Sequence, residues 1–353
     1  MNRKLNITTP LFDFDDILIE PSESSSISSR KEINPYLENG YLPLMTAPMD
    51  TVIGENNFHL FQNNKIQPVL PRTKNPELDY IDSSIFLSYS LTDFKRIFLD
   101  NTPRYEPTKK MLVLIDVANG HMGDLHISAE KAKQKYGEWM VLMVGNVANP
   151  KTVGILSKIG VDYIRIGIGN GGGCLTTQNT GIGYPMASLI VESSYEVMGD
   201  TKLVADGGFK KYSDVIKALA LGADYVMLGS ILNKCLESAG KTRQTTYAGN
   251  GEIVNQYSNE TLRMFNNGVP LFKTFRGMST KEVQKTWGKE NLTTSEGVVR
   301  THQVEYTLSG WVENFTDYLK SAMSYCNKKT LPEFIGKVDY NIITQNALNR
   351  FQK

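Results

Sequence analysis

The sequence has few of the residues that build covalent cross-links and metal centres. It contains three cysteines and four histidines among 353 residues. Cys174, Cys235 and Cys326 are odd in number, far apart and in no CxxC arrangement, which argues against a disulfide framework or a zinc site. The histidines show no HExxH spacing. We therefore expect no metal centre built on side-chain ligands.

An excess of charge of one sign is also lacking. Lysine and arginine number 38 against 37 aspartate and glutamate, which leaves a formal net charge of +1 at pH 7. The basic residues are scattered rather than clustered, so nothing predicts binding to nucleic acid. No apolar run approaches the length of a membrane span, and the first residues lead into no signal-peptide core. We expect a cytoplasmic protein with neither nucleic-acid nor membrane partners.

What the chain does have is a repeated alternation of short apolar segments and helical ones. From Tyr41 onward, β-branched or apolar runs are each followed by a polar turn and a helix, which indicates βα units and a parallel sheet. Eight such units close naturally into a (β/α)8 barrel, and a doubly wound open sheet is the alternative. The eight predicted strands are residues 42–45, 66–70, 84–88, 111–115, 141–144, 162–166, 202–205 and 225–228.

Helices are predicted between these strands. Several of them begin near a capping residue, and two end at Gly160 and Gly222, as helix caps favour. The expected helices are residues 54–64, 92–99, 127–136, 150–159, 186–198 and 212–221.

The segments outside the alternation are expected to be peripheral. The N-terminal forty residues, with a serine-rich stretch at 22–29, predict a solvated arm. The alternation stops at Lys241, and residues 248–252 predict a hairpin turn. A polar, weakly patterned stretch follows, and we expect it to form a mobile flap over the barrel mouth at about residues 279–305. Residues 311–326 are helical again, and the tail after Pro332 is expected to lie at the periphery of a single domain spanning residues 1–353.

One glycine-rich run, residues 167–177, ends on a cysteine and two threonines. Its glycines let the backbone approach an anion or a flat ring closely. The run follows the predicted strand 162–166, and α/β barrels keep their chemistry in the loops after strands. Cys174 is therefore a candidate nucleophile. The alternative interpretation is a flexible loop with an inert buried thiol.

Two further glycine loops follow the last two predicted strands. Asp206-Gly207-Gly208 comes after strand seven, and Gly229-Ser230 comes after strand eight. Barrels commonly bind phosphate at these two loops through main-chain N–H groups. Asp206 could accept hydrogen bonds from a ribose diol. Tight turns that need glycine for geometry are the alternative.

A series of short motifs in this chain resembles the IMP dehydrogenase and GMP reductase family of purine-nucleotide barrels. Each motif is weak alone, but together they appear in family order at compatible spacing and cover nearly the whole chain. They are residues 14–21, 47–52, 115–120, 145–147, the cysteine loop 167–177, residues 180–185, 206–208 and 276–279. The resemblance implies a (β/α)8 barrel that binds a purine nucleotide and assembles as a homotetramer.

The balance of motifs favours the reductase branch. There is no room for the CBS domains that dehydrogenases usually insert between the second and third βα units. No Arg-Tyr pair, which activates water in dehydrogenases, occurs between Lys281 and Glu296. Residues 115–120 and 295–297 are similar to the reductase versions of these motifs, whereas residues 47–49 and 276–278 are more similar to the dehydrogenase versions.

Two alternatives remain open. An IMP dehydrogenase, which makes XMP with NAD, would need a relocated water activator, for which Arg300 or Lys289 are candidates. A catalytically silent purine-nucleotide-binding barrel would need no reactive thiol.

The resemblance implies an NADPH-dependent reductive deamination of GMP, or of a deoxy or modified guanine nucleotide, to IMP and ammonia. Cys174 would form a covalent adduct at C2 of the purine, and Thr176 with Glu296 would relay the proton to the leaving ammonia. The implied substrate-binding residues are Met49, Asp206, Gly207, Gly208, Gly229, Ser230, Arg276, Gly277 and Met278. The implied coenzyme-binding residues are Asp116, Asn119, Gly120, Gly167 and Gly169, and the carbonyls of Gly171, Gly173 and Cys174 would bind potassium.

The cysteine loop departs from the family pattern while keeping the nucleophile and one threonine in register. The pattern has a serine where this chain has Gly172, so a hydroxyl that contacts phosphate is missing. Added glycine also gives the loop more conformational entropy to lose on ordering. The other departures are Asn170 for proline, Gly173 for an aliphatic residue, Leu175 for threonine and Thr177 for arginine.

Overall fold

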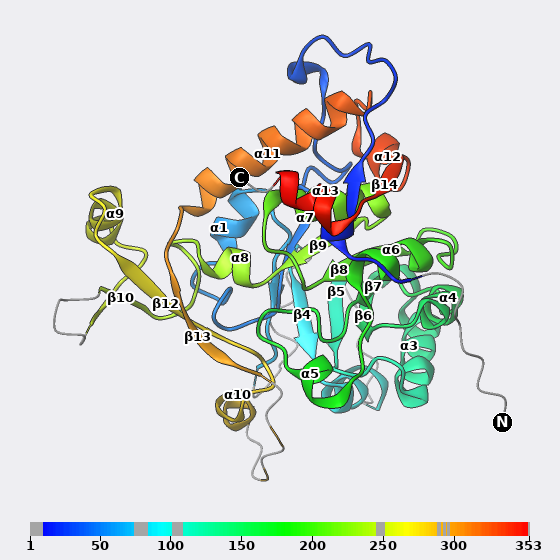
Figure 1. Ribbon diagram of the computed structural model, residues 1–353. Coiled ribbons are helices and arrows are strands. Elements are labelled where there is room, and N and C mark those ends of the chain that lie inside the picture. Colours follow the sequence, from blue (N-terminus) through cyan, green and yellow to red (C-terminus); the bar gives the residue numbers. More distant parts are fainter. Residues whose placement is uncertain are drawn as a thin grey trace.

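Eight parallel strands form the centre of the fold and confirm the predicted barrel (Figure 1). The computed structural model describes residues 10–73, 84–100, 109–244, 251–287, 291, 294 and 297–351. The strands are β2 (Leu44–Thr46), β3 (Val69–Leu70), β4 (Phe86–Tyr89), β5 (Met111–Asp116), β6 (Met140–Val147), β7 (Tyr163–Ile166), β8 (Lys202–Asp206) and β9 (Tyr225–Leu228).

The two ends of this sheet meet, which distinguishes a barrel from an open sheet. Hydrogen bonds join neighbouring strands in the order β2-β9-β8-β7-β6-β5-β4-β3. Just before β3, Gln67 pairs with Met45 of β2 in a parallel bridge. The main-chain N–H of Thr46 donates to the Gln67 carbonyl at 3.1 Å, and the Gln67 N–H donates to the Leu44 carbonyl at 3.0 Å. These bonds close the ring.

Helices connect the strands at all six predicted places; α4 and α7 have the predicted bounds, and the other four have shifted ends. The helix predicted from residue 54 begins four residues later, after turns, and the one predicted to end at residue 198 ends at Ser194. The helices are α1 (Phe58–Asn63), α2 (Leu91–Phe94) continued by the π-helical turn η4 (Lys95–Leu99), α3 (Gly123–Tyr136), α4 (Pro150–Ile159), α6 (Met186–Ser194), α7 (Tyr212–Leu221) and the short α8 (Ser230–Asn233).

Alternate residues of the strands fill the barrel interior, and the others pack against the helices. Leu114 of β5 and Val204 of β8 belong to the interior cluster. Because side chains on a strand alternate between its two faces, the inward positions next toward the carboxyl ends are those two residues further on. These positions hold Asp116 and Asp206. The barrel interior is therefore apolar along the middle of the strands and polar at their carboxyl ends.

An antiparallel sheet lies to one side of the barrel, in yellow and orange in Figure 1. We expected residues 241–310 to lack regular structure beyond a hairpin, and for the described part of this segment that expectation was wrong. The predicted hairpin is confirmed by its two paired strands, although residues 245–250 lie outside the described part. The elements are β10 (Thr242–Gln244), β11 (Glu252–Val254), α9 (Asn259–Asn266), β12 (Leu271–Arg276), α10 (Lys281–Thr286) and β13 (Val299–Gln303).

One of the two inner strands of this sheet, β12, was missed because a lysine occupies one of its buried positions. Its burial alternates, with Leu271, Lys273 and Phe275 on the buried face. The Lys273 ammonium donates to the carbonyl of Ser238 at 2.6 Å and lies 3.4 Å from that of Gly240. Burial lowers the pKa of Lys273 to about 7, although nearby Cys235 and Glu237 act in the opposite direction.

Replacing this lysine should change how stability depends on pH. Between pH 7 and the ordinary lysine pKa, the unfolded chain binds more protons than the folded one, so the free energy of unfolding rises with pH. We expect a rise of about 2 kcal/mol from about pH 7 to 9 to be present in the parent protein and absent in Lys273→Met. Urea unfolding at both pH values measures it. The exposed neighbour Lys241 serves as the control, because Lys241→Met should leave the rise intact.

The N- and C-terminal segments pack together on the outside of the barrel (Figure 1). Strand β1 pairs with β14, and the predicted C-terminal helix is present as α11. None of the helices in the described part of the chain is long and apolar enough to cross a bilayer. The elements are η1 (Phe14–Asp16), β1 (Ile17–Ile19), η2 (Arg30–Glu32), α11 (Leu308–Tyr325), α12 (Leu331–Phe334), β14 (Tyr340–Ile342) and α13 (Gln345–Phe351).

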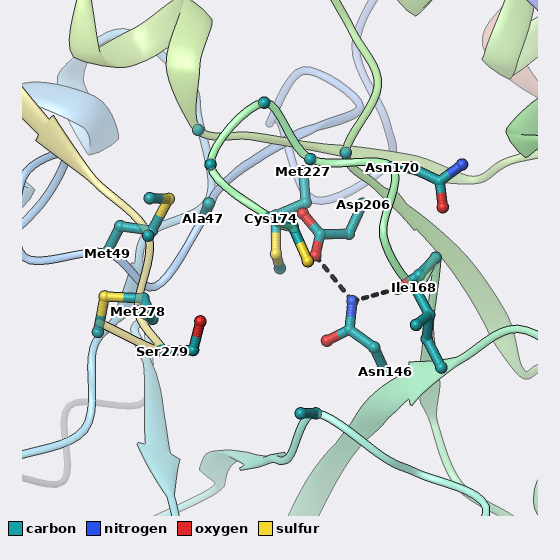
Figure 2. Close-up of a pocket in the computed structure, with 18 of the residues that line it drawn as sticks. Ala47, Met49, Asn146, Ile168, Asn170, Cys174, Asp206, Met227, Met278 and Ser279 are labelled. Carbon is teal, nitrogen blue, oxygen red and sulfur yellow. Dashed lines mark hydrogen bonds between the residues drawn. The ribbon is translucent and has the colours of Figure 1, made fainter. Parts of the chain in front are cut away.

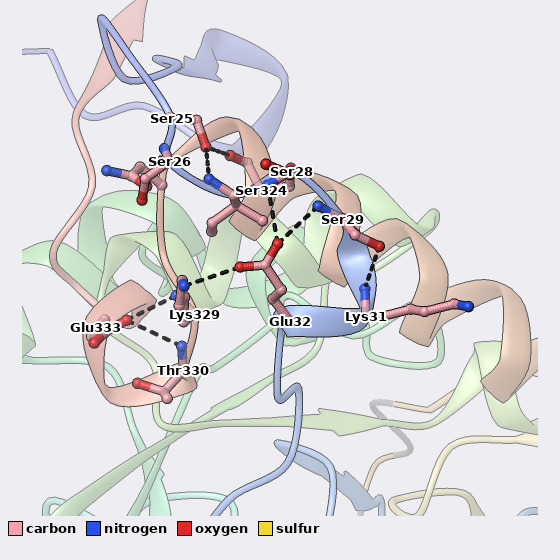
Figure 3. A network of polar contacts seen from close by, with 12 residues as sticks. Ser25, Ser26, Ser28, Ser29, Lys31, Glu32, Ser324, Lys329, Thr330 and Glu333 are labelled. Atoms are coloured by element: carbon pink, nitrogen blue, oxygen red, sulfur yellow. Dashed lines mark hydrogen bonds and ion pairs between the residues drawn. The ribbon is translucent and has the colours of Figure 1, made fainter.

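The serine-rich arm is mostly exposed, yet it is attached to the rest of the protein (Figure 3). Ser29 caps η2, and the Glu32 carboxylate accepts the main-chain N–H of Ser29 in return. Glu32 also pairs with Lys329 at 3.0 Å, and Ser26 donates to the Asn327 side chain at 3.1 Å. These contacts fix the arm against the end of α11.

Candidate active site

A cavity of about 460 Å3 opens at the carboxyl ends of the barrel strands (Figure 2). Loops that follow six of the eight strands contribute to its wall, together with Asn146 near the end of β6, and β12 and the segment after it cover one side. A volume of this size suits a small organic ligand. The predicted site residues that line it are Met49, Asp116, Gly167, Gly169, Gly171, Gly173, Cys174, Thr176, Asp206, Gly207, Gly208, Gly229, Ser230, Gly277 and Met278.

Three predicted site residues, Arg276, Asn119 and Gly120, do not line the cavity. The Arg276 guanidinium pairs with Asp50 and, at 3.0 Å, with Glu282, so it ties the loop after β2 to β12 and α10. Asn119 and Gly120 form a turn beside the cavity. Glu296 lies outside the described residues.

Cys174 is half-buried and faces the cavity. Its thiol donates to the Thr176 hydroxyl at 3.2 Å. Thr176 is the first residue of the short helix α5 (Thr176–Thr180). The main-chain N–H of Cys174 donates to the Gly171 carbonyl at 3.0 Å, which turns the loop tightly around the thiol. The arrangement presents a sulfur nucleophile with a hydroxyl beside it that can pass on a proton.

The antiparallel sheet β11-β10-β12-β13, called the small sheet below, packs directly on the cysteine loop. Cys174 pairs with Gly297 in an antiparallel bridge, and the Val298 N–H donates to the Gly173 carbonyl at 3.1 Å. A Cβ at position 173 would lie 3.0 Å from the Phe275 ring. The Phe275 ring therefore occupies the space that an aliphatic side chain at position 173 would need, which explains the glycine there. A Cβ at Gly172 would meet nothing within 4 Å, so that departure leaves open space.

A buried arginine joins two carboxylates beneath the thiol. Arg165 of β7 is 8% exposed. It donates from Nη1 to Asp116 Oδ1 at 2.7 Å, and its Nε and Nη2 lie 3.0 and 2.9 Å from Asp206 Oδ2. Burial acts to lower the pKa of Arg165, but the charges of Asp206 and Asp116 outweigh it and raise the pKa. The arginine is thus permanently charged at the floor of the cavity.

Asp206 keeps one carboxylate oxygen for a ligand. Asn146 donates to Asp206 Oδ2 and to the Gly167 carbonyl, each at 2.8 Å, as the dashed lines in Figure 2 show. Together with the two contacts from Arg165, these donors occupy Oδ2. Asp206 Oδ1 has no hydrogen-bond partner within the described part of the chain and remains available as an acceptor.

Arg165, Arg72 and Trp287 are among the site residues that were not identified from the sequence. A charged residue at an inward position of an apolar strand was the available signal for Arg165, since such a residue must be paired. Arg72 follows β3, and its Nε lies 3.1 Å from Asp116 Oδ2. Its guanidinium stacks on the ring of Trp287, 3.8 Å from the centroid. No sequence signal connects Arg72 with Trp287, because their contact depends on how the small sheet docks.

The loop carbonyls offer only partial support for a potassium site. The carbonyls of Gly171 and Gly173 already accept the N–H groups of Cys174 and Val298. Each carbonyl retains a second lone pair, but the loop displays no ring of free carbonyls among the described residues. We derive no chemical step through potassium, and its binding stays a prediction.

Comparison with known proteins was consistent with this geometry. The family model described as "IMP dehydrogenase / GMP reductase domain" matches residues 107–352. The chain is 32% identical over 244 residues to an inosine-5'-monophosphate dehydrogenase of Chlorobaculum tepidum, a match that covers 67% of this chain and 46% of the dehydrogenase. The chain thus spans about half the length of that relative.

Proteins named GMP reductase match over a greater length. The chain is 28% identical over 356 residues to the GMP reductase of Streptococcus agalactiae serotype V, covering 96% of this chain and 97% of the reductase. The GMP reductase of Streptococcus pyogenes serotype M4 is 26% identical over the same shares of both chains.

Proposed function

Because the chain belongs to the IMP dehydrogenase/GMP reductase family, we propose that it is an NADPH-dependent GMP reductase. The observation that carries the proposal is the extent of the match to proteins named GMP reductase, 96% of this chain and 97% of theirs. The thiol of Cys174, which faces a cavity of nucleotide size, supports it. The overall reaction would be GMP + NADPH + 2 H⁺ → IMP + NADP⁺ + NH₄⁺.

The chemistry needs a nucleophile, a proton donor and a hydride. The Cys174 thiolate adds to C2 of the guanine ring, the C2–N bond breaks, and ammonia leaves once it is protonated. Thr176, whose hydroxyl is 3.2 Å from the thiol, passes a proton toward the amino group, with Glu296 as the proposed source. NADPH supplies the hydride that adds to C2. The C–S bond then breaks, which releases IMP and the thiolate.

The cavity residues divide into those that hold the nucleotide and those that face the coenzyme. Asp206 Oδ1 accepts a ribose hydroxyl, and the thioethers of Met49 and Met278 provide polarizable contacts for the purine. The loops at Gly207-Gly208 and Gly229-Ser230 bind the phosphate with main-chain N–H groups.

The coenzyme would lie against the other side of the cavity. The wall there is formed by residues 116–118 together with Gly167 and Gly169. The terminal nitrogens of Arg72 donate no hydrogen bond to another residue within the described ranges, so they can bind an anionic group of the coenzyme. A homotetramer of single-domain subunits in the cytoplasm and a requirement for potassium complete the proposal.

The second candidate is an IMP dehydrogenase, favoured by the 32% identity to a protein of that name. Of its two candidate water activators, Arg300 is exposed on β13 and does not line the cavity. Lys289 lies outside the described residues. Arg300 therefore does not serve this reaction from its place on β13.

The test is the absorbance of NADPH in the presence of purified protein, potassium and GMP. We expect NADPH to be oxidised with equal amounts of IMP and ammonia formed, because each hydride displaces one amino group. Replacing GMP by dGMP measures how strongly the ribose contact at Asp206 discriminates. Reduction of NAD by IMP, without the first activity, would instead establish the dehydrogenase. Tight GMP binding with none of these reactions would leave a nucleotide-binding barrel.

A further inference from the structure

His121 is a titratable side chain beside the cavity that the proposed reaction does not use. It lies in the loop between β5 and α3, and its main-chain N–H donates to the Asn119 side chain at 3.1 Å. Its ring contacts the loop between β6 and α4 and the first turn of α4. Nε2 lies 3.1 Å from the Ala148 nitrogen in that loop, and Nδ1 lies 3.0 Å from the hydroxyl of Thr152 in α4. Both ring nitrogens are therefore engaged by the neighbouring βα unit.

The bond to Ala148 determines the protonation state of the ring. A main-chain N–H can only donate, so His121 Nε2 must accept and carries no proton. The proton of the neutral ring is then on Nδ1, which donates to Thr152. A protonated ring carries hydrogen on both nitrogens and loses the bond to Ala148. Burial, and next the charge of His126 on α3, lower the pKa of His121 and favour the neutral form.

The β5–α3 loop, which carries His121, forms one wall of the cavity together with the end of β6. Val117 and Ala118 line the cavity from this loop, and Asn146 lines it from the end of β6. The Gly120 N–H donates to the Asn146 carbonyl at 2.8 Å, and His126 Nε2 donates to the Gly120 carbonyl at 3.1 Å. Because Asn146 also holds Asp206, a change in how these loops meet is transmitted to both the coenzyme wall and the ribose contact.

We propose that His121 is a positioning residue: its neutral ring clasps the β5–α3 loop to Ala148 and α4 in the arrangement that receives the coenzyme, and protonation opens the clasp. The identity of the ligand, an NADP-type dinucleotide, rests on the proposed function. The clasp itself rests only on the hydrogen bonds of the ring. Loss of one such bond corresponds to a fall in coenzyme affinity of about tenfold.

The experiment measures NADP⁺ binding, since NADP⁺ is stable in acid, by calorimetry at about pH 8 and in steps down to about pH 4.5, because the pKa of His121 lies below the ordinary histidine value. In the parent protein the affinity should fall about tenfold at the lowest pH. His121→Gln should bind with near-parent affinity at about pH 8, because its amide oxygen can accept from Ala148, and should show much less of the acid loss. His121→Phe should bind weakly at every pH. The exposed His59 supplies a control, because His59→Gln should keep the parent pH profile.

A second measurement separates this inference from the proposed function. Hydrogen exchange of the peptide containing Ala148 should be slow at neutral pH in the parent and in His121→Gln, and fast in His121→Phe. An undiminished acid loss of affinity in His121→Gln, or unchanged exchange in His121→Phe, would overturn the inference. If NADP⁺ and NADPH fail to bind while the exchange pattern is as expected, the proposed function fails and the clasp stands.

Discussion

The Cys174→Ala variant is expected to bind GMP and NADPH normally and to lose turnover by a factor of about 10⁴ or more, as removal of a covalent nucleophile does elsewhere. The substitution removes only Sγ. The main-chain bonds that shape the loop, from Cys174 N–H to Gly171 and from Val298 N–H to the Gly173 carbonyl, do not involve the side chain. Binding should therefore change by no more than about threefold, which is under 1 kcal/mol.

Single-turnover mixing and calorimetry separate the two effects. Single-turnover data report the loss of the covalent step, and calorimetry reports the retained affinity for GMP. Cys326→Ala is the control, since Cys326 lies just beyond α11, far from the cavity, and should leave turnover intact. Turnover that persists in Cys174→Ala would refute the covalent route. Weak GMP binding in that variant would show instead that the thiol contributes to the ground state.

The Arg165→Met variant is expected to lose about 3–5 kcal/mol of unfolding free energy, the usual cost of removing one member of a buried charge network. Methionine fills a similar volume but leaves Asp116 and Asp206 without the guanidinium that joins them. Arg72 still contacts Asp116, and Asn146 still donates to Asp206, so neither carboxylate is left with no partner. The expected loss of unfolding free energy therefore comes from removing the positive charge that the two carboxylates share, and not from removing all of their hydrogen bonds.

Urea unfolding of three variants makes this prediction specific. Arg300→Met, a change at an exposed arginine on β13, should alter stability by less than about 0.5 kcal/mol. The double variant Arg165→Met with Asp206→Asn should be more stable than Arg165→Met alone, because it removes one of the uncompensated charges. If Arg165→Met is as stable as the parent, the network does not hold the barrel floor together.

The barrel could be predicted because its evidence is local. Each strand is a short apolar run, several helices have recognisable caps, and eight repeats leave few ways to close a sheet. The ends of elements were less accurate. The helix expected from residue 54 begins at Phe58, since the preceding residues form turns whose bonds to Met49 and Gly54 are visible only in three dimensions.

The parts that could not be predicted depend on contacts between distant segments. Lys273 interrupts the apolar–polar alternation of the β12 sequence. Its burial could not be predicted, because its ammonium binds carbonyl groups of a loop that the sequence does not place beside it. Gly173 departs from the family pattern, and the sequence could not explain this because the ring of Phe275, which occupies the space beside it, comes from a distant segment. Arg165 looked like an ordinary strand residue because its two partners lie on other strands.

The docking of the small sheet on the cysteine loop also bears on the order in which the site is completed during synthesis. Barrel closure requires β9, whose residues 225–228 leave the ribosome before β12 and β13. The barrel can therefore close while Cys174 still lacks its bridge to Gly297. A nascent chain can therefore hold a formed barrel and an uncovered thiol until β12 and β13 have been synthesised.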